Sequence, residues 1–219
     1  IISFLGFSAC LELYVNGEFC GYGEGSHNSA EFDISNMLIS GENELLCVVY
    51  RWSTGTYLEC QDMFRDNGIF RDVLLFKNNK NSVYDFEVKT KFNTDLTYDL
   101  TVLPSIKLVD ECEFSATLFD GNELVSSKSV NVDSKQIDKI VFSSLDVKEW
   151  SAEEPNLYTL VVSLSKDGEI VELIRRPIGF KHIKIIGNVF TFNNKNIKLL
   201  GVNHHDTNPK TGYVMTVED

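Results

Sequence analysis

The sequence predicts an all-β protein with a domain boundary close to residue 80. Short runs in which apolar and polar residues alternate recur along most of the chain, as expected for strands that turn one face toward a core. Turn-forming Asn, Asp and Gly residues separate these runs. A polar, turn-rich stretch at residues 77–82 (KNNKNS) divides an irregular first unit from a second unit whose strands are evenly spaced.

The first unit is expected to contain a β-hairpin and two further strands. Residues 10–21 alternate in the β manner, and Asn16-Gly17 in their middle is typical of a type I′ turn. Ser35-Asn36 can start a short helical turn. Residues 44–50 form a nearly continuous apolar strand, and residues 73–76 form the strand that closes the unit.

The loop between those last two strands, residues 50–73, carries most of the chemistry. It holds Arg51, Trp52, Asp62 and Arg65. Loops that combine aromatic, acidic and guanidinium side chains on a β scaffold are often binding or catalytic sites. The alternative is a packed loop that closes one end of a sandwich, with Trp52 buried and the arginines satisfying buried acceptors. The residues alone leave both interpretations open.

The second unit has the pattern of an immunoglobulin-like sandwich. About seven short alternating strands, with turns such as Asp120-Gly121 and Asp167-Gly168 between them, fill roughly a hundred residues. The predicted strands are residues 83–92, 96–109, 111–120, 123–132, 135–144, 157–166 and 169–180. Between the fifth and sixth of these strands, Trp150, Pro155 and Tyr158, in residues 147–158, are expected to form a crossover that staples the sandwich.

The C-terminal residues indicate the beginning of a different domain. Residues 184–186 and 189–192 flank a turn at Gly187-Asn188. Residues 197–202 are a short apolar segment followed at once by Asn203-His204-His205-Asp206. A buried strand with titratable side chains at its C-terminal end is how a β/α barrel displays an active site. We therefore expect a barrel strand at 197–202, a barrel helix capped by Thr216, and a polypeptide that continues at both ends.

Charge, cysteines and hydropathy exclude several classes of function. The formal net charge of −12 disfavours nucleic acid and anionic membranes as partners, because both reward a basic surface. No apolar run is long enough to span a bilayer, and the opening IISFLGFSAC lacks the basic start of a signal peptide. Five cysteines without paired CxxC spacing indicate reduced thiols. These features favour a cytoplasmic protein.

Four separated stretches of the chain carry a family resemblance. They are LYVNGEFCGYGEGSHNSAEFDIS, RWSTGTYLECQDMFRDNGIFRDV, EWSAEEPNLYTL and LLGVNHHDTNPKTGYVMT. In order and spacing they resemble glycoside hydrolase family 2, and they look most like its large β-galactosidase branch. The resemblance implies that residues 1–80 are the later part of a jelly-roll sugar-binding domain. It further implies an immunoglobulin-like domain at residues 82–181 and the start of a catalytic TIM barrel at residues 182–219.

The resemblance implies a retaining β-galactosidase that hydrolyses terminal β-D-galactosides such as lactose. Both catalytic glutamates would lie beyond Asp219, so no catalytic residue is expected in this chain and the chain alone is expected to be inactive. Asp62 matches the family aspartate that binds the sugar near O6 and ligates sodium. His205 matches the family histidine that hydrogen-bonds the galactosyl ring and favours the distorted transition state. Asn203 and Asp206 are expected to hold the loop.

Cofactors and partners follow from the same resemblance. Na⁺ and Mg²⁺ are implied for the complete enzyme, and neither site is expected to be completed within this chain, because one carboxylate is far from a full set of ligands. The implied partners are the β-galactoside and the remainder of the same polypeptide. The complete protein is expected to be a homo-oligomer.

Four positions depart from the family pattern. The chain has His204, Phe64, Cys60 and Thr54 where the family usually has arginine, tryptophan, aspartate and aspartate. Histidine lacks the bidentate fork with which arginine anchors its partners, so the role of His204 is open. These departures leave substrate preference unsettled.

Two alternatives therefore accompany the β-galactosidase hypothesis. The first keeps the family and changes the sugar, to a β-glucuronide or a β-mannoside. The second is a non-catalytic carbohydrate-binding sandwich module, which would need exposed aromatic side chains. Against that module, Trp52, Phe64 and Trp150 are expected to be buried.

Overall fold

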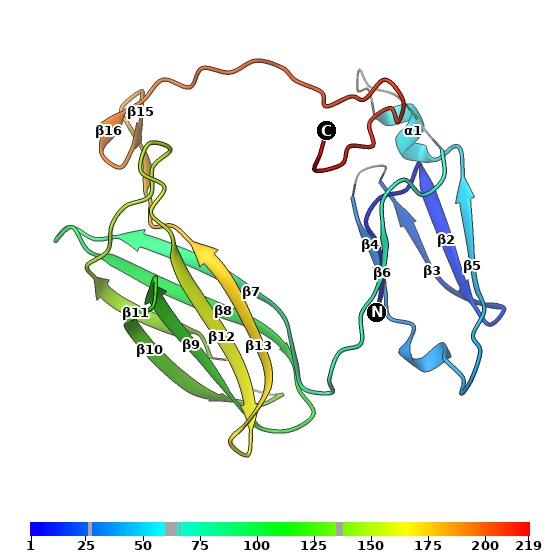
Figure 1. The fold of residues 1–219 in the computed structure, drawn as a ribbon, viewed down its shortest axis with the longest axis horizontal. Helices are drawn as coiled ribbons and strands as arrows, with labels where there is room; N and C mark the ends of the chain where they lie inside the picture. The colour runs from blue at the N-terminus through cyan, green and yellow to red at the C-terminus, as the bar shows by residue number, and fades with distance from the viewer. Residues whose placement is uncertain (26–27, 60–64, 66, 135–137) are drawn as a thin grey trace. The chain divides into compact units, whose positions relative to one another are not determined.

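The regular secondary structure of the chain is almost entirely β, as the computed structural model in Figure 1 shows. The structure describes residues 1–25, 28–59, 65, 67–134 and 138–219. Their contacts define two compact units, the first formed by Ile1–Lys77 with Gly201–Asp219 and the second by Asn78–Leu200. No helix in these residues has the length and apolar character to cross a bilayer. The predicted all-β class is confirmed.

The first unit contains two three-stranded antiparallel sheets. One has the order β4-β1-β6 and the other β3-β2-β5. Their bounds are β1 Ile2–Phe4, β2 Cys10–Val15, β3 Glu18–Glu24, β4 Ala30–Phe32, β5 Leu45–Tyr50 and β6 Val73–Leu75. Buried residues of both sheets share one core, including Phe4 and Phe32 of the first sheet and Leu11 and Leu13 of the second. The alternation that predicted β2 therefore reflects a shared interior between two sheets.

Local turn chemistry in the first unit follows the sequence. Asn16 and Gly17 connect β2 to β3 with φ angles of 52° and 84°, the left-handed values that a type I′ turn requires at both positions. The predicted helical turn is a 3₁₀-helix, η1, at Ser35–Met37. The central loop contains one further short helix, α1, at Thr54–Leu58.

The second unit is a sandwich of a four-stranded and a three-stranded sheet. The strands are β7 Ser82–Phe92, β8 Tyr98–Lys107, β9 Cys112–Asp120, β10 Glu123–Val132, β11 Ile140–Leu145, β12 Tyr158–Lys166 and β13 Glu169–Ile178. The sheet orders are β10-β9-β12-β13 and β11-β8-β7. Apolar residues from both sheets, such as Leu100, Phe114, Phe142 and Leu160, are fully buried between them. All seven predicted strands are present; β11 begins at Ile140, five residues after its predicted start, and residues 135–137 of that prediction lie outside the described residues.

The predicted crossover holds one end of this sandwich together. The Trp150 backbone N–H donates to the Phe180 carbonyl at 2.8 Å, and the Tyr158 hydroxyl accepts a bond from the Lys148 N–H at 2.9 Å. Gly179 leaves room for this contact, because a Cβ there would lie 2.9 Å from the Trp150 Cβ. The staple predicted around Trp150 and Tyr158 is therefore present.

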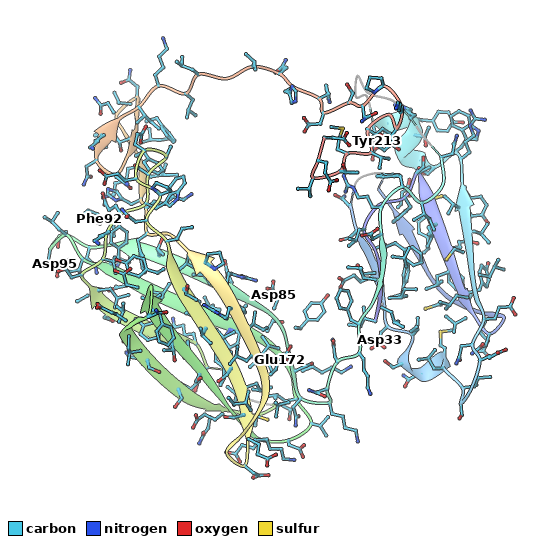
Figure 2. All side chains as sticks on the ribbon, in the orientation of Figure 1. Asp33, Asp85, Phe92, Asp95, Glu172 and Tyr213 are labelled. Atoms are coloured by element: carbon cyan, nitrogen blue, oxygen red, sulfur yellow. The ribbon has the colours of Figure 1, made fainter. Side chains whose placement is uncertain are left out.

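A small three-stranded sheet follows the sandwich. It consists of β14 Ile183–Ile186, β15 Val189–Phe192 and β16 Lys195–Asn196, with the predicted turn at Gly187-Asn188. The His182 ring stacks on Phe92, labelled in Figure 2, with ring centroids 3.9 Å apart. The Asn193 amide donates to the Trp150 carbonyl at 3.0 Å, which ties the end of β15 to the staple.

The barrel strand predicted at residues 197–202 is wrong for this structure. Those residues form no strand, and Leu199, Leu200 and Val202 are exposed. A barrel strand needs hydrogen-bonded neighbours on both sides, and no described residue supplies them here. The apolar residues of this segment therefore remain exposed in the structure.

Residues 201–219 group with the first unit rather than with the sandwich. The Phe70 and Tyr213 rings (Tyr213 is labelled in Figure 2) meet edge to face at 4.8 Å. The Asp219 carboxylate accepts bonds from the Thr216 N–H at 2.9 Å and the Asn208 amide at 2.8 Å. The predicted helix would begin where the given sequence ends, so the role of Thr216 as its cap stays a prediction.

Self-association of the isolated chain is the first testable expectation. β5 lies at the edge of its sheet among the described strands, and its Leu45 and Leu46 are 45% and 53% exposed. An exposed apolar edge strand can pair with another chain. We expect the elution volume in size-exclusion chromatography to decrease as concentration rises from about 1 to 100 µM. Leu46→Lys should reduce this shift, whereas Leu157→Lys, at a 53% exposed site outside any strand, should not. A monomer at every concentration would contradict the expectation.

Candidate functional site

The helix α1 lies at the centre of the loop that the sequence singled out. A helix of five residues is unstable on its own and needs support from its surroundings. Ser53 and Thr56 form a capping box, in which the Ser53 N–H donates to the Thr56 hydroxyl at 3.1 Å. These bonds satisfy backbone groups at the start of the helix.

A carboxylate from β3 provides the second support. Glu24 accepts a bond from the Gly55 N–H at 2.8 Å and another from the Tyr22 hydroxyl at 2.8 Å. The Gly55 bond, followed by those from Tyr22 and Ser53, holds the pKa of the Glu24 carboxyl below its ordinary value. Each bond favours the charged form, so Glu24 remains ionised while it holds the loop.

The loop arginines act on the same helix and its neighbours. Arg65 donates to the carbonyls of Thr56 and Glu59, both at 2.6 Å, and so satisfies acceptors at the end of α1. The Arg51 guanidinium lies 5.2 Å from the centroid of the Trp52 ring. Arg65 thus satisfies backbone acceptors, as the packed-loop interpretation expected of the arginines, but these bonds are exposed rather than buried.

The prediction that Trp52 is buried is wrong. Its side chain is 57% exposed, and Tyr57 beside it is 80% exposed. The two ring centroids lie 6.4 Å apart with 31° between the ring planes. Because tryptophan has an apolar body and a polar N–H, it occurs at both buried and exposed positions, and the sequence alone does not predict which applies. Trp150 is half-buried, so the burial expected of it is reached only in part.

An open depression of about 340 Å³ lies over α1. Its lining residues are Trp52, Ser53, Thr54, Tyr57 and Leu58. Sequence reasoning missed Tyr57, Leu58 and the supporting Glu24. Glu24 lies 31 residues from Gly55, so no local sequence pattern could have indicated its support of the helix.

The predicted sugar-binding residues fall in the first unit. Asp62, to which a sugar contact and a sodium ion were assigned, lies outside the described residues, as do Cys60 and Phe64. His205 is exposed, and no hydrogen bond to its ring is formed by the part of the chain that the structure describes. The structure therefore neither brings Asp62 and His205 together nor separates them.

The residues around His205 interact with one another. The His204 Nε2 atom and the Asp206 carboxylate lie 2.6 Å apart, with both side chains more than 70% exposed. Asp206 thus contacts His204, a neighbour in the same loop, and Asn203 is exposed. An exposed pair of this kind contributes little to stability.

Metal-binding clusters were sought among the titratable groups of the described residues. No three His, Cys, Asp or Glu side chains within the described ranges are grouped so that they could hold an ion. The four described cysteines, Cys10, Cys20, Cys47 and Cys112, are free thiols, as predicted.

The fold and these surfaces define an all-β module of two layered units with an exposed aromatic loop. Residues 1–79 match the family model described as "Glycosyl hydrolases family 2, sugar binding domain", and residues 76–181 match "Glycosyl hydrolases family 2". The chain belongs to glycosyl hydrolase family 2.

Curated relatives are similar over the whole chain. A β-galactosidase of Actinobacillus pleuropneumoniae is 36% identical over 99% of this chain and 20% of its own length. One of Halalkalibacterium halodurans is 39% identical over 100% of this chain and 22% of its own length. The chain thus spans about a fifth of these relatives.

Solved structures share the fold at lower identity. A putative β-galactosidase from Bacteroides fragilis matches with a TM-score of 0.82 at 20% identity, over 99% of this chain and 35% of that one. A Bacteroides uniformis β-glucuronidase matches with a TM-score of 0.85 at 20% identity, over 99% of this chain and 28% of that one. These matches support the β-sandwich architecture.

The support of α1 by Glu24 is expected to depend on pH. Because folding lowers the Glu24 pKa, its contribution is present above the ordinary carboxyl pKa of about 4.3 and is lost as pH falls through the lower folded value. In a Trp150→Phe background, which leaves Trp52 as the remaining tryptophan, we expect Trp52 emission to change in that acid range. Glu24→Gln should remove the transition, and Glu18→Gln on the same strand should retain it. An identical transition in both variants would contradict the assignment.

Proposed function

We propose that this chain is part of a retaining β-galactosidase that hydrolyses terminal β-D-galactosides such as lactose. The observation that carries the proposal is the 36–39% identity, spread over nearly the whole chain, to proteins named β-galactosidase. The four motif segments lie in both units and in the C-terminal residues, so the likeness is not confined to one domain.

In this proposal the chain contributes the rim of a galactose pocket. Asp62 accepts hydrogen bonds from the sugar near O6, and its carboxylate gives Na⁺ one of the oxygen ligands that hard cations prefer. His205 hydrogen-bonds the galactosyl ring as it distorts. The exposed position of His205 leaves its ring available to a substrate. Asn203 and Asp206 hold the surrounding loop.

The chemistry itself is assigned to residues outside this chain. In retaining enzymes two carboxyl groups about 5–5.5 Å apart act as nucleophile and as acid/base, through a covalent glycosyl-enzyme. We propose that residues 1–80 belong to a partial jelly roll, that residues 82–181 link it to the catalytic domain, and that residues 182–219 begin the TIM barrel. The complete protein is then a cytoplasmic homo-oligomer that also uses Mg²⁺.

Two other sugars are candidate substrates. Structural neighbours include proteins titled β-glucuronidase, so a β-glucuronide is the second candidate substrate. A β-mannoside is the third. A glucuronide carries a carboxylate at C5, whereas the carboxylate of Asp62 suits a neutral hydroxyl near O6 better, because two carboxylates repel each other.

A substrate panel on the complete protein tests this choice. The expected result is that kcat/KM for p-nitrophenyl β-D-galactoside exceeds that for the corresponding glucuronide and mannoside by at least about tenfold, a difference of about 1.4 kcal/mol in transition-state binding. A preference for the glucuronide would replace the proposed substrate and leave the family assignment intact.

A further inference from the structure

A pair of aromatic rings joins two segments of the first unit that are far apart in the sequence. Phe70 lies in the loop of residues 50–73, and Tyr213 lies near the end of the chain. Their rings meet edge to face, with centroids 4.8 Å apart and 83° between the ring planes. Aromatic pairs favour this geometry, because the positive edge of one ring meets the negative face of the other. Both side chains are half-buried.

Phe70 is held by the part of the chain that follows β1. Its backbone N–H donates to the Gly6 carbonyl at 3.2 Å. Gly6 also leaves the space that the ring occupies, because a Cβ there would lie 2.8 Å from the Phe70 Cε2 atom. The preceding residue, Ile69, forms a β-bridge with Phe7, which is buried in the core of the unit. The core and its first strand therefore fix where the Phe70 ring lies.

Tyr213 belongs to a compact turn that is closed by Asn208. The backbones of Asn208 and Gly212 exchange two hydrogen bonds, at 2.7 and 3.0 Å. Gly212 has a φ angle of 68°, a left-handed value that glycine adopts without strain. Of residues 201–219, only Asn208, Gly212, Tyr213 and Val214 are not exposed. The turn is therefore attached to the rest of the unit on the side where Tyr213 lies, which Figure 2 labels.

The turn also determines where His205 can lie. His205 stands three residues before Asn208, and three residues of extended chain span at most about 10 Å. The His205 ring has no hydrogen bond to the part of the chain that the structure describes. Its position is therefore set through the backbone, along a path that runs from Phe70 through Tyr213 to Asn208.

We propose that Phe70 and Tyr213 position His205 for its contact with the sugar. Neither ring touches the substrate in this proposal, and both act through His205. The inference rests on the proposed function, in which His205 hydrogen-bonds the galactosyl ring, and the choice of residues rests on the geometry of the contact. A shift of about 1 Å in a group that contacts the substrate can lower the rate by about 100-fold, so an aromatic contact outside the pocket can control activity.

Limited proteolysis of the 219-residue chain tests whether the contact holds the turn. Trypsin cleaves after lysine, and Lys210 lies inside the turn whereas Lys198 precedes it. Because cleavage of a structured segment requires local opening, Tyr213→Ala should speed cleavage after Lys210 at least about fivefold and leave cleavage after Lys198 unchanged. Tyr213→Phe keeps the ring and should cleave at the original rate. Tyr213 lies in neither sheet, so both sheets remain intact in these variants. Equal cleavage after Lys210 in all three chains would overturn the proposal.

Steady-state kinetics of the complete protein test whether the contact acts through His205. The substrate is the p-nitrophenyl glycoside that the protein hydrolyses fastest. Tyr213→Ala should lower kcat/KM about tenfold, mainly through kcat, because the displaced imidazole fails to strengthen its bond in the transition state. Tyr213→Phe should stay within about twofold of the original protein, because the edge-to-face contact needs only the ring. Tyr84→Ala, which removes a 60% exposed tyrosine from the other unit, should have no effect.

A double variant separates positioning from a general structural role. In a His205→Ala background, Tyr213→Ala should cause no further loss of kcat/KM, since the group that it positions is already absent. A further tenfold loss in that background would overturn the proposal, because Tyr213 would then act on something other than His205.

The kinetic measurements also separate failure of this proposal from failure of the proposed function. If the complete protein hydrolyses β-galactosides and Tyr213→Ala leaves kcat/KM unchanged, the positioning role is withdrawn and the proposed function stands. If the complete protein hydrolyses no glycoside, the proposed function falls and the positioning role falls with it, even where trypsin shows that Tyr213 holds the turn.

Discussion

Alanine in place of His205 is expected to lower the kcat/KM of the complete protein for a β-galactoside, the substrate proposed above, by about 10- to 100-fold. A hydrogen bond to a group that carries charge contributes about 1.5–3 kcal/mol, and the proposed bond to the galactosyl ring strengthens as the ring distorts in the transition state. Most of the loss should therefore appear in kcat rather than in KM.

The neighbouring histidine offers a matched control. His204 interacts with Asp206 at the surface, and its side chain is 71% exposed. His204→Ala should change kcat/KM by less than about threefold, since exposed ion pairs contribute roughly 0–1 kcal/mol. Steady-state kinetics with a chromogenic β-galactoside would measure both variants. An unaffected His205→Ala enzyme beside an impaired His204→Ala enzyme would reverse the assignment of the two histidines.

The largest effect on stability is expected from Leu160→Ala. Leu160 lies on β12, a central strand of the four-stranded sheet, and is fully buried opposite Leu118 of β9. Removing a buried leucine side chain costs about 2–5 kcal/mol of unfolding free energy, through lost transfer energy and the cavity left behind. The sandwich core encloses this position from both sheets, so little relaxation can fill the space.

Leu173 on the adjacent strand β13 supplies the control. It is 51% exposed, and Leu173→Ala should change stability by less than about 1 kcal/mol. Trp52 lies in the first unit and Trp150 in the second, so a Trp52→Phe background makes urea unfolding followed by fluorescence report on the sandwich. Equal destabilisation by the two alanine variants would contradict the placement of Leu160 in the core.

Prediction from sequence worked where local pattern and tertiary structure agree. In the strand β12 every second residue is buried, because Tyr158, Leu160, Val162 and Leu164 all face one core. This period of two can be recognised in the amino-acid sequence. The Asn16-Gly17 turn could also be predicted, because few pairs of residues adopt positive φ angles at both positions. Such features depend on neighbouring residues only.

Prediction failed where the answer depends on partners distant in sequence or outside the chain. Residues 197–202 are apolar enough for a strand, yet a strand forms only against another strand. Trp52 is a large aromatic residue of the kind often found in a core, but the path of the loop leaves its side chain exposed. The bond between Glu24 and Gly55 crosses 31 residues and leaves no trace in either local sequence.

The most direct test of the account compares the 219-residue chain with the complete protein on one chromogenic β-galactoside. The central claim is that this chain holds parts of the sugar pocket while the catalytic glutamates lie elsewhere. It predicts turnover by the complete protein and none above background by the chain alone. Hydrolysis by the isolated chain at a rate comparable to that of the complete protein would contradict the claim.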